Sequence, residues 1–444
     1  MTTAPRPRRF KTVLMDRLLA VWQEVGVGEM VIQAEIEFEH PLELPRLRRA
    51  VFLLLAEHPV LGCRFVIDRG KTFWEETPGA ADVAFQEVDP ETYQILKHES
   101  LKLHGDCQIL VAATPNRSGH RLLVRVSHVA SDAGGVREIL WDLARSYTQL
   151  RLEPDYRPTP RPLSGRSPFQ IVRHIPLRSW LWLPFEFMKA VVSGLHPLDT
   201  HTVHFDDTPH DAVEYVVRHI SATETRRLRA FALRFDATLN DLLVAAWYRA
   251  LAKIGGWNGG SALRLQMTVD MRRWYLPARR GGSICNLSAY EYPYLGHELV
   301  ETLEDTLVRV ASLTRVRKNR GIGLLLYLPI LTTAWMPYPW GRRWFRSSLG
   351  GKLFLRNYPP VLTNMGPITA EDVTFDTPAQ SAYLLTPPIH RPLLGAGLSG
   401  YAGCLTLSGG TTPTGAPHLA TLLDAVLEEL SVVASGAPSP QNVT

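Results

Sequence analysis

The first half of the chain alternates between strand-like and helix-like patterns. In residues 30–39, apolar residues alternate with glutamates over the second half of the segment, which is typical of a half-buried strand. Residues 44–57 carry leucine, valine and alanine at helical spacing. The His58-Pro59 pair ends that helix, because proline cannot continue its hydrogen-bond ladder. This alternation predicts an α/β fold.

Similar patterns continue to the end of the chain, around a Pro- and Arg-rich stretch at residues 153–165 that indicates a boundary between two lobes. We therefore expect two α/β lobes, residues 1–165 and 166–444. The further strands are expected at 62–67, 72–75, 121–127, 214–220, 263–269, 361–364 and 404–408, and the further helices at 135–149, 221–235, 238–255, 299–317 and 418–433.

Composition excludes several classes of protein. The 444 residues are 45% hydrophobic and 20% charged, as in an ordinary globular protein and unlike a disordered chain, a collagen or a coiled coil. The four cysteines are too scattered for a disulfide framework or a Cys-rich zinc site, so we expect a metal-free protein in the cytoplasm. No Walker-type phosphate loop occurs, and we expect no nucleotide cofactor beyond coenzyme A.

The formal charge of +5 comes from 48 basic and 43 acidic residues that are spread along the chain. No aromatic-interleaved basic run of the kind expected in a nucleic-acid reader occurs, so we expect no nucleic-acid partner. A mildly basic surface instead suits an acidic partner, such as a phosphorylated cofactor or an acidic carrier protein.

Two apolar segments stand out. Residues 321–340 carry no charge, and twenty such residues are long enough to span a membrane. Prolines 329, 337 and 339 interrupt this segment, which argues against a spanning helix. Residues 180–187 form a second patch that is rich in aromatic side chains. We favour buried or tunnel-lining structure over peripheral contact with a membrane or lipid substrate, and a true span is the least favoured alternative.

The sharpest local feature is the segment 126–135. An apolar strand leads into His128, Asp132 follows four residues later, and Gly134-Gly135 lets the chain turn before a helix. A neutral imidazole is the natural general base near pH 7. An arginine partner for Asp132 would fix the direction of the imidazole. The residues alone leave two interpretations open: a catalytic base, or a structural histidine with satisfied hydrogen bonds.

Residues 127–132 resemble the His-His-x-x-x-Asp-Gly motif of the superfamily that joins chloramphenicol acetyltransferase, the condensation domains of peptide synthetases and related acyltransferases. Four other blocks are similar to this superfamily in the same order, so that the resemblance covers residues 14–435. They are the first helix with its "His-Pro-x-Leu" ending (44–65), the helix pair of the second lobe (221–251), the "Val-Asp-x-Arg … Asn" block (269–287) and the "Asn-x-Gly" strand (363–366).

The resemblance implies two chloramphenicol-acetyltransferase-like lobes in a V-shaped pseudo-dimer, with His128 midway along a tunnel between them. It also implies that His128 deprotonates a hydroxyl or amine as this acceptor attacks an acyl thioester. Coenzyme A or the phosphopantetheine of an acyl or peptidyl carrier protein would carry the thioester as a co-substrate. No cofactor would be tightly bound.

The resemblance also implies roles for residues around His128. Asp132 would be structural and would pair with Arg272, although a surface charge at a strand end is the alternative for Arg272. Gly134 would support the turn. The candidates for binding the substrate or an oxyanion are Ser127, Asn286 and Asn364, with turn formation as the alternative for Asn364.

The segment departs from the motif at two positions. Ser127 replaces the first histidine, and Ala133 replaces the glycine, which is shifted to Gly134. No Asp-Phe-Gly-x-Gly block is found near the C-terminus. We predict acyl transfer to a small-molecule acceptor in secondary or lipid metabolism, with ester formation preferred. The alternatives are a non-catalytic condensation-like module that binds a carrier protein, and a tunnel reused for cyclisation or elimination.

Overall fold

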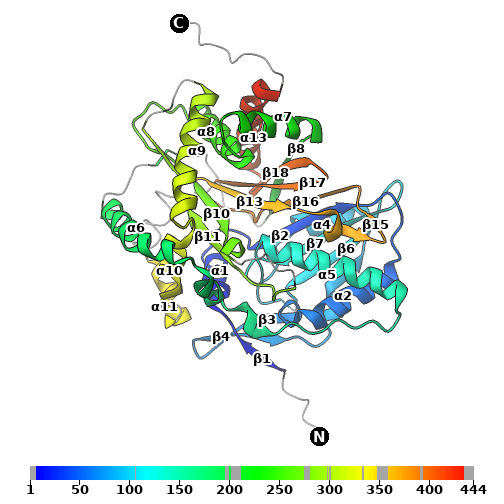
Figure 1. The fold of residues 1–444 in the computed structure, drawn as a ribbon. Helices are drawn as coiled ribbons and strands as arrows, with labels where there is room; N and C mark the ends of the chain where they lie inside the picture. The colour runs from blue at the N-terminus through cyan, green and yellow to red at the C-terminus, as the bar shows by residue number, and fades with distance from the viewer. Residues whose placement is uncertain are drawn as a thin grey trace.

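The computed structural model describes residues 7–105, 107–195, 200–201, 212–274, 281–297, 299, 302–332, 335–347, 359–390 and 394–434. Two large β-sheets with helices packed on them dominate the fold (Figure 1), which confirms the predicted α/β class. The first sheet has the strand order β16-β2-β7-β6-β5, and the second has the order β11-β10-β13-β17-β18-β8.

The strands of the first sheet are β2 (Val31–Glu37), β5 (Phe85–Glu87), β6 (Ile109–Pro115), β7 (His120–Ser127) and β16 (Ser381–Leu385). Those of the second are β8 (Glu214–Ile220), β10 (Gln266–Asp270), β11 (Ser288–Glu291), β13 (Val361–Pro367), β17 (Gly395–Tyr401) and β18 (Cys404–Thr411). A small third sheet joins β1 (Arg9–Lys11), β4 (Lys71–Glu76) and β3 (Cys63–Asp68).

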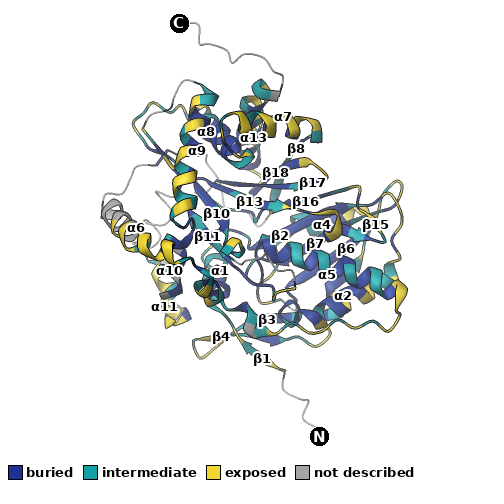
Figure 2. Cartoon of the chain, in the orientation of Figure 1, coloured by how far each residue is buried: buried dark blue, intermediate teal, exposed yellow. Residues whose placement is uncertain are grey.

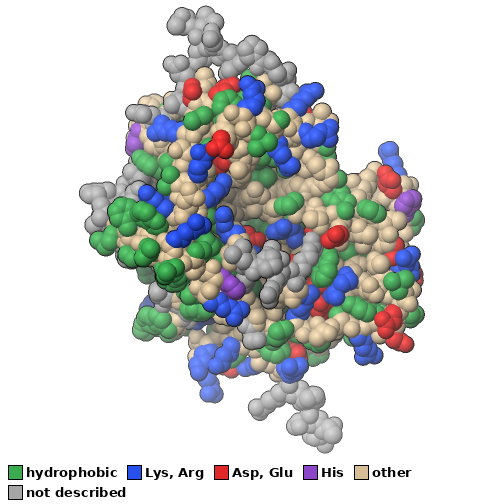
Figure 3. Space-filling view, viewed as in Figure 1, with side chains coloured by type: hydrophobic (Ala, Val, Ile, Leu, Met, Phe, Trp, Pro, Cys, Tyr) green, Lys and Arg blue, Asp and Glu red, His purple; other side chains and the backbone are tan. Residues whose placement is uncertain are grey.

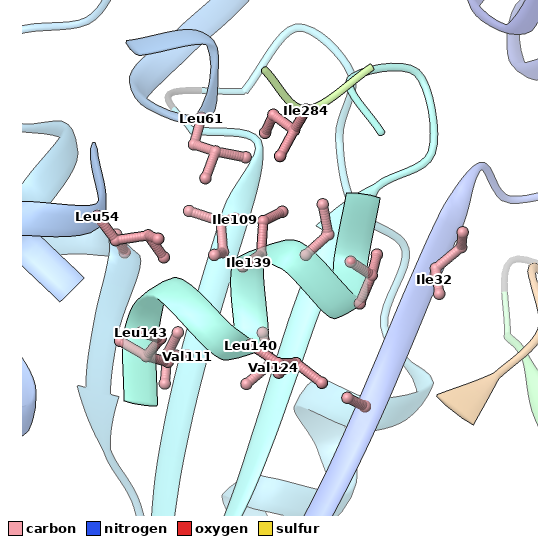
Figure 4. Packing of buried hydrophobic residues seen from close by; sticks show 14 of the residues in the cluster. Ile32, Leu54, Leu61, Ile109, Val111, Val124, Ile139, Leu140, Leu143 and Ile284 are labelled. Atoms are coloured by element: carbon pink, nitrogen blue, oxygen red, sulfur yellow. The ribbon is translucent and has the colours of Figure 1, made fainter. Parts of the chain in front are cut away.

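Helices cover the sheets because their apolar faces match the apolar faces of the strands. On the first sheet, α2 (Leu44–Glu57) and α5 (Ala133–Leu152) bury leucines and isoleucines against the strand faces (Figure 4), and α4 (Pro90–His98) packs on the opposite face. On the second sheet, the core contains residues of α7 (Ala222–Arg234), α8 (Leu239–Ile254), α9 (Leu303–Arg320) and α13 (Ala416–Ala434). Figure 2 shows buried strands between helices whose outer faces are exposed.

One strand comes from a distant part of the sequence. β16 pairs antiparallel with β2, with Leu384 opposite Ala34, although it follows β2 by more than three hundred residues. The first sheet therefore includes a strand from outside the predicted first lobe. The lobe boundary at residue 165, the V shape and the tunnel between the lobes stay predictions.

The strand predicted over residues 263–269 is divided in the structure. β9 (Leu263–Arg264) pairs with β12 (Tyr294–Gly296), whereas β10 joins the second sheet. The backbone amide of Leu265 donates to the Pro293 carbonyl between the two strands. The single predicted strand therefore forms two strands that belong to different sheets.

The uncharged segment 321–340 folds into α10 (Leu324–Thr332) and the start of α11 (Tyr338–Arg346). Tyr327 and Leu331 are buried in a small cluster with Ile171 and Ile175, as the favoured interpretation predicted. The prediction of buried side chains is wrong for the outer residues of both apolar segments, because Trp335 and the second patch at residues 180–187 expose large apolar side chains. Within the described residues, no helix combines the length and the apolar character that crossing a membrane requires.

Candidate active site

His128 lies where β7 leaves the first sheet. Its backbone amide donates to the Met30 carbonyl at 2.7 Å, which continues the pairing with β2 for one residue. The amides of Ala130 and Ser131 then donate back to the Ser127 carbonyl at 3.0 and 3.1 Å. These bonds close a tight turn, so the imidazole leaves the sheet in a fixed direction.

The imidazole of His128 has a defined tautomer. Nδ1 lies 2.9 Å from the Ser131 carbonyl, and a carbonyl can only accept, so Nδ1 carries the hydrogen. Nε2 is left with a lone pair. The ring is half-buried rather than sealed in the core. Burial lowers the pKa of His128, although the Ser131 carbonyl and the charge of Asp132 act in the opposite direction. His128 is therefore a neutral base at pH 7.

Asp132 holds the turn from the other side. Its Oδ1 accepts from the Gly135 amide at 2.8 Å, which caps the first turn of α5. Its Oδ2 accepts from Arg272 Nη1 at 2.9 Å and from the Leu287 amide at 2.7 Å. Burial acts to raise the pKa of Asp132, but the Arg272 guanidinium and the amide donors outweigh it and lower that pKa. The buried carboxylate is thus charged and fully partnered.

Arg272 connects the turn to the second sheet. It follows the end of β10, where Nη1 also reaches Asp270 Oδ1 at 3.1 Å and Nη2 donates to the Cys285 carbonyl at 3.0 Å. Burial acts to lower the pKa of Arg272, but the charge of Asp132 and Asp270 raises it. The pairing with Asp132 that the resemblance implied is therefore present, and the alternative of a surface charge does not hold.

Position 134 leaves no room for a side chain. A Cβ at this position would lie 2.5 Å from Arg272 Nη1 and 2.9 Å from Asp270 Oδ2. Because glycine has no Cβ, the guanidinium can approach the first turn of α5 directly.

Asn286 contacts the backbone of the turn. Its Nδ2 donates to the carbonyls of His128 at 2.8 Å and Val129 at 3.2 Å. This amide nitrogen already has two acceptors, so the geometry favours a positioning role over oxyanion binding. Ser127 is the last residue of β7, where it is buried and in register with Val31.

Asn364 lies in the second sheet, in a recess that His128 does not line. It is exposed at a bulge of β13, with Oδ1 accepting from the Gly366 amide at 2.9 Å and Nδ2 donating to Asn240 at 3.1 Å. With Asn240 and Gly366 it lines a recess of about 380 Å³, and His128 is not part of that lining. The structure therefore does not bring Asn364 together with the imidazole in this recess, and its contacts favour turn formation.

Sequence reasoning missed Arg166. This buried residue donates from Nη1 to the carbonyls of Ala130 at 3.0 Å and Ile284 at 2.6 Å, and from Nη2 to Asp16 at 2.8 Å. It thus joins the His128 turn to the segment before Asn286. Asp16 could have pointed to Arg166 in the sequence. It is a carboxylate on the buried face of α1 (Leu14–Glu24), and a buried carboxylate requires a cationic partner.

One buried cluster contains side chains of the kinds that bind metal ions. Among the described residues, Glu57, His58 and Asp142 bring potential metal donors together. Arg161 Nη2 lies 2.7 Å from Asp142, and Arg145 Nη2 lies 2.8 Å from Glu57. Because two guanidinium groups already neutralise the carboxylates, this donor set does not fit a metal ion.

Comparisons with known proteins relate this geometry to a family. No family model matches the chain. A component of the linear gramicidin synthase of Brevibacillus parabrevis is 26% identical over 317 residues, which are 66% of this chain and only 6% of that protein. The chain thus spans a small fraction of the curated relative that it matches.

Solved structures match over nearly the whole chain. The first condensation domain of the calcium-dependent antibiotic synthetase, in complex with a substrate analogue, has a TM-score of 0.69 at 16% identity and 98% coverage of both chains. Polyketide synthase associated protein 5 from Mycobacterium tuberculosis has a TM-score of 0.65 at 15% identity, with 99% of this chain and 100% of that chain covered. An epimerization domain of tyrocidine synthetase has a TM-score of 0.64 at 15% identity, with 98% of both covered.

These matches define the class of fold. The chain has the chloramphenicol-acetyltransferase-like fold of condensation and epimerization domains, which confirms the fold that the resemblance implied.

Proposed function

We propose that the protein is a thioester-dependent acyltransferase in which His128 is the general base. The hydrogen bond between Nδ1 and the Ser131 carbonyl carries this proposal, because it leaves a basic Nε2 on a half-buried ring. The fold shared with condensation domains supports a carrier-protein-linked transfer or condensation.

In the proposed reaction, Nε2 accepts the proton of an acceptor hydroxyl or amine. The acceptor atom attacks the thioester carbonyl, the carbon–sulfur bond breaks, and the imidazolium returns its proton to the thiolate. Asp132 and Arg272 position the turn and do not exchange protons, since the carboxylate is buried and its lone pairs are engaged. We further propose coenzyme A or a phosphopantetheinyl carrier protein as the donor and a small-molecule acceptor.

Replacing His128 with alanine tests the proposal. We expect thiol release from acyl-coenzyme A or acyl-pantetheine, in the presence of alcohols and amines, to fall about 10²–10⁴-fold. The control is His297→Ala, at an exposed histidine. Release of thiol at the wild-type rate by the His128 variant would contradict the mechanism.

Mass spectrometry separates the two alternatives. Carrier binding without any acyl product would indicate the non-catalytic module that the altered Ser127 and Ala133 positions suggest. A product of unchanged mass, or one lighter by water, would indicate cyclisation or elimination.

A further inference from the structure

One side of the molecule combines exposed apolar side chains with exposed arginines. α6 (Leu177–Leu195) packs against α9 and α10, and α11 packs against α1 on the same side (Figure 1). Figure 3 shows hydrophobic side chains gathered over α6, α10 and α11. We call this surface the aromatic face. Its most exposed apolar residues are Leu177, Trp180, Leu181, Trp182, Phe185 and Met188 of α6, with Trp335, Trp340 and Trp344 around α11.

The inward-facing side chains of these segments pack into a small hydrophobic core. Ile171, Leu324 and Tyr327 are buried together, and the Tyr327 hydroxyl donates to the Pro168 carbonyl at 2.8 Å. Leu181 is nevertheless 74% exposed and Trp335 is 78% exposed. The fold therefore does not need the outer side chains for its core, and clustered exposed apolar residues mark an interaction surface.

Basic residues outnumber acidic residues in the segments that build the aromatic face, although α6 also contains Glu186. Residues 306–347 contain eight arginines and lysines and no aspartate or glutamate, and residues 156–185 contain five arginines and no acidic residue. Some of these basic residues form ion pairs, such as Arg166 with Asp16 and Arg342 with Glu24, and do not add to the charge of the face. Among these residues, Arg173, Arg178, Arg343 and Arg346 are exposed.

Arginine and tryptophan meet directly at one point of the face. The guanidinium of Arg320, the last residue of α9, lies over the Trp182 ring at 4.7 Å from its centroid. Tryptophan prefers the boundary between lipid headgroups and acyl chains, and arginine binds the phosphates there. An acidic protein partner would match the charge, but it would not require this many exposed tryptophan and leucine side chains.

We propose that the aromatic face binds the surface of an anionic phospholipid bilayer, with α6 and α11 lying in the headgroup region. The residue before α10 lies close to the candidate active site, because a Cβ at Gly323 would lie 2.9 Å from Met271 Sδ, next to Arg272. Membrane binding would thus hold one side of the site near lipid. The proposal does not depend on the acyl-transfer chemistry.

Vesicle flotation of the full chain tests the proposal. We expect binding to vesicles of phosphatidylcholine and phosphatidylglycerol in equal parts, little binding to phosphatidylcholine alone, and release as salt screens the charges. Leu181→Glu combined with Phe185→Glu should reduce the bound fraction at least about tenfold.

A matched control exists elsewhere on the surface. Leu233→Glu with Phe52→Glu changes side chains that are 68% and 58% exposed, against 74% and 57% for Leu181 and Phe185, and should leave vesicle binding unchanged. Arg343→Glu should weaken binding, whereas Arg117→Glu, at an exposed turn, should not.

Two outcomes would overturn the proposal. The first is equal binding by the aromatic-face variant and its control. The second is a failure of the wild-type chain to bind anionic vesicles, and binding of an acidic carrier protein through the same residues would then identify the partner. Loss of acyl transfer in either pair of variants would not bear on vesicle binding.

Discussion

At the scale of single residues, the site depends on one imidazole whose two nitrogens have different tasks. Nδ1 is held by the Ser131 carbonyl and Nε2 is basic. Burial lowers the pKa of His128 and so favours the neutral ring.

This shift predicts a pH profile. A general base acts when it is neutral, so the rate should be constant above neutrality and fall as the pH drops through the pKa of His128. Because that pKa is lowered, the acidic limb of kcat/KM should have its midpoint below the ordinary histidine value of about 6.5. A midpoint clearly above that value would contradict the burial of the ring.

Gly134 gives a second prediction at this scale. Gly134→Ala places a Cβ against Arg272 and should displace the guanidinium from Asp132, lowering the free energy of unfolding by about 1–3 kcal/mol. Chemical denaturation measures this loss. Gly282→Ala is the matched control, since a Cβ at Gly282 would meet nothing within 4 Å. Equal stability of the two variants would show that Arg272 moves aside without cost.

At the scale of elements, Arg166 joins pieces that are distant in sequence. It connects α1, the turn after β7 and the segment before β11 through Asp16, Ala130 and Ile284.

Arg166→Met would leave Asp16 buried without its cation. We expect a loss of about 3–5 kcal/mol in the free energy of unfolding, partly restored by Arg166→Lys. Thermal and urea unfolding provide the measurement, and Arg173→Met, at an exposed arginine, serves as the control. Unchanged unfolding of Arg166→Met would mean that water or another donor replaces the guanidinium.

Local signals predicted the elements that depend on local energetics. Residues 44–57 form α2 as predicted, and Ser221 and Glu224 form the expected capping box at the start of α7. The residues around His128 predicted the turn and an arginine partner for Asp132, and the family resemblance implied that this partner is Arg272.

Non-local interactions could not be predicted in the same way. β16 is five residues long, and only its pairing with β2 reveals which sheet it joins. Arg166 and Asp16 are 150 residues apart, so no spacing rule connects them. Asn286 matched a family block, but its contacts with two carbonyls of the turn depend on the folded arrangement.

At the scale of the whole molecule, the two halves share a sheet. The chain of residues 1–165 alone would lack β16 and leave the edge of β2 unpaired. We expect this fragment to be insoluble or to self-associate when expressed alone, because unpaired strand edges recruit other chains. Size-exclusion chromatography provides the measurement, and addition of a peptide with the β16 sequence should restore monomers. A well-folded monomeric fragment without that peptide would contradict the expectation.

The position of β16 also has a consequence during synthesis. β7 is the last of the other four strands of the first sheet to be made, and it ends at Ser127. β16, which pairs with β2, ends only at Leu385. At about 5–20 residues per second, a ribosome needs roughly 10–50 s to make the intervening chain. Throughout this interval the nascent protein carries an open strand edge, so its yield in a cell should depend on chaperones that shield that edge until translation is nearly complete.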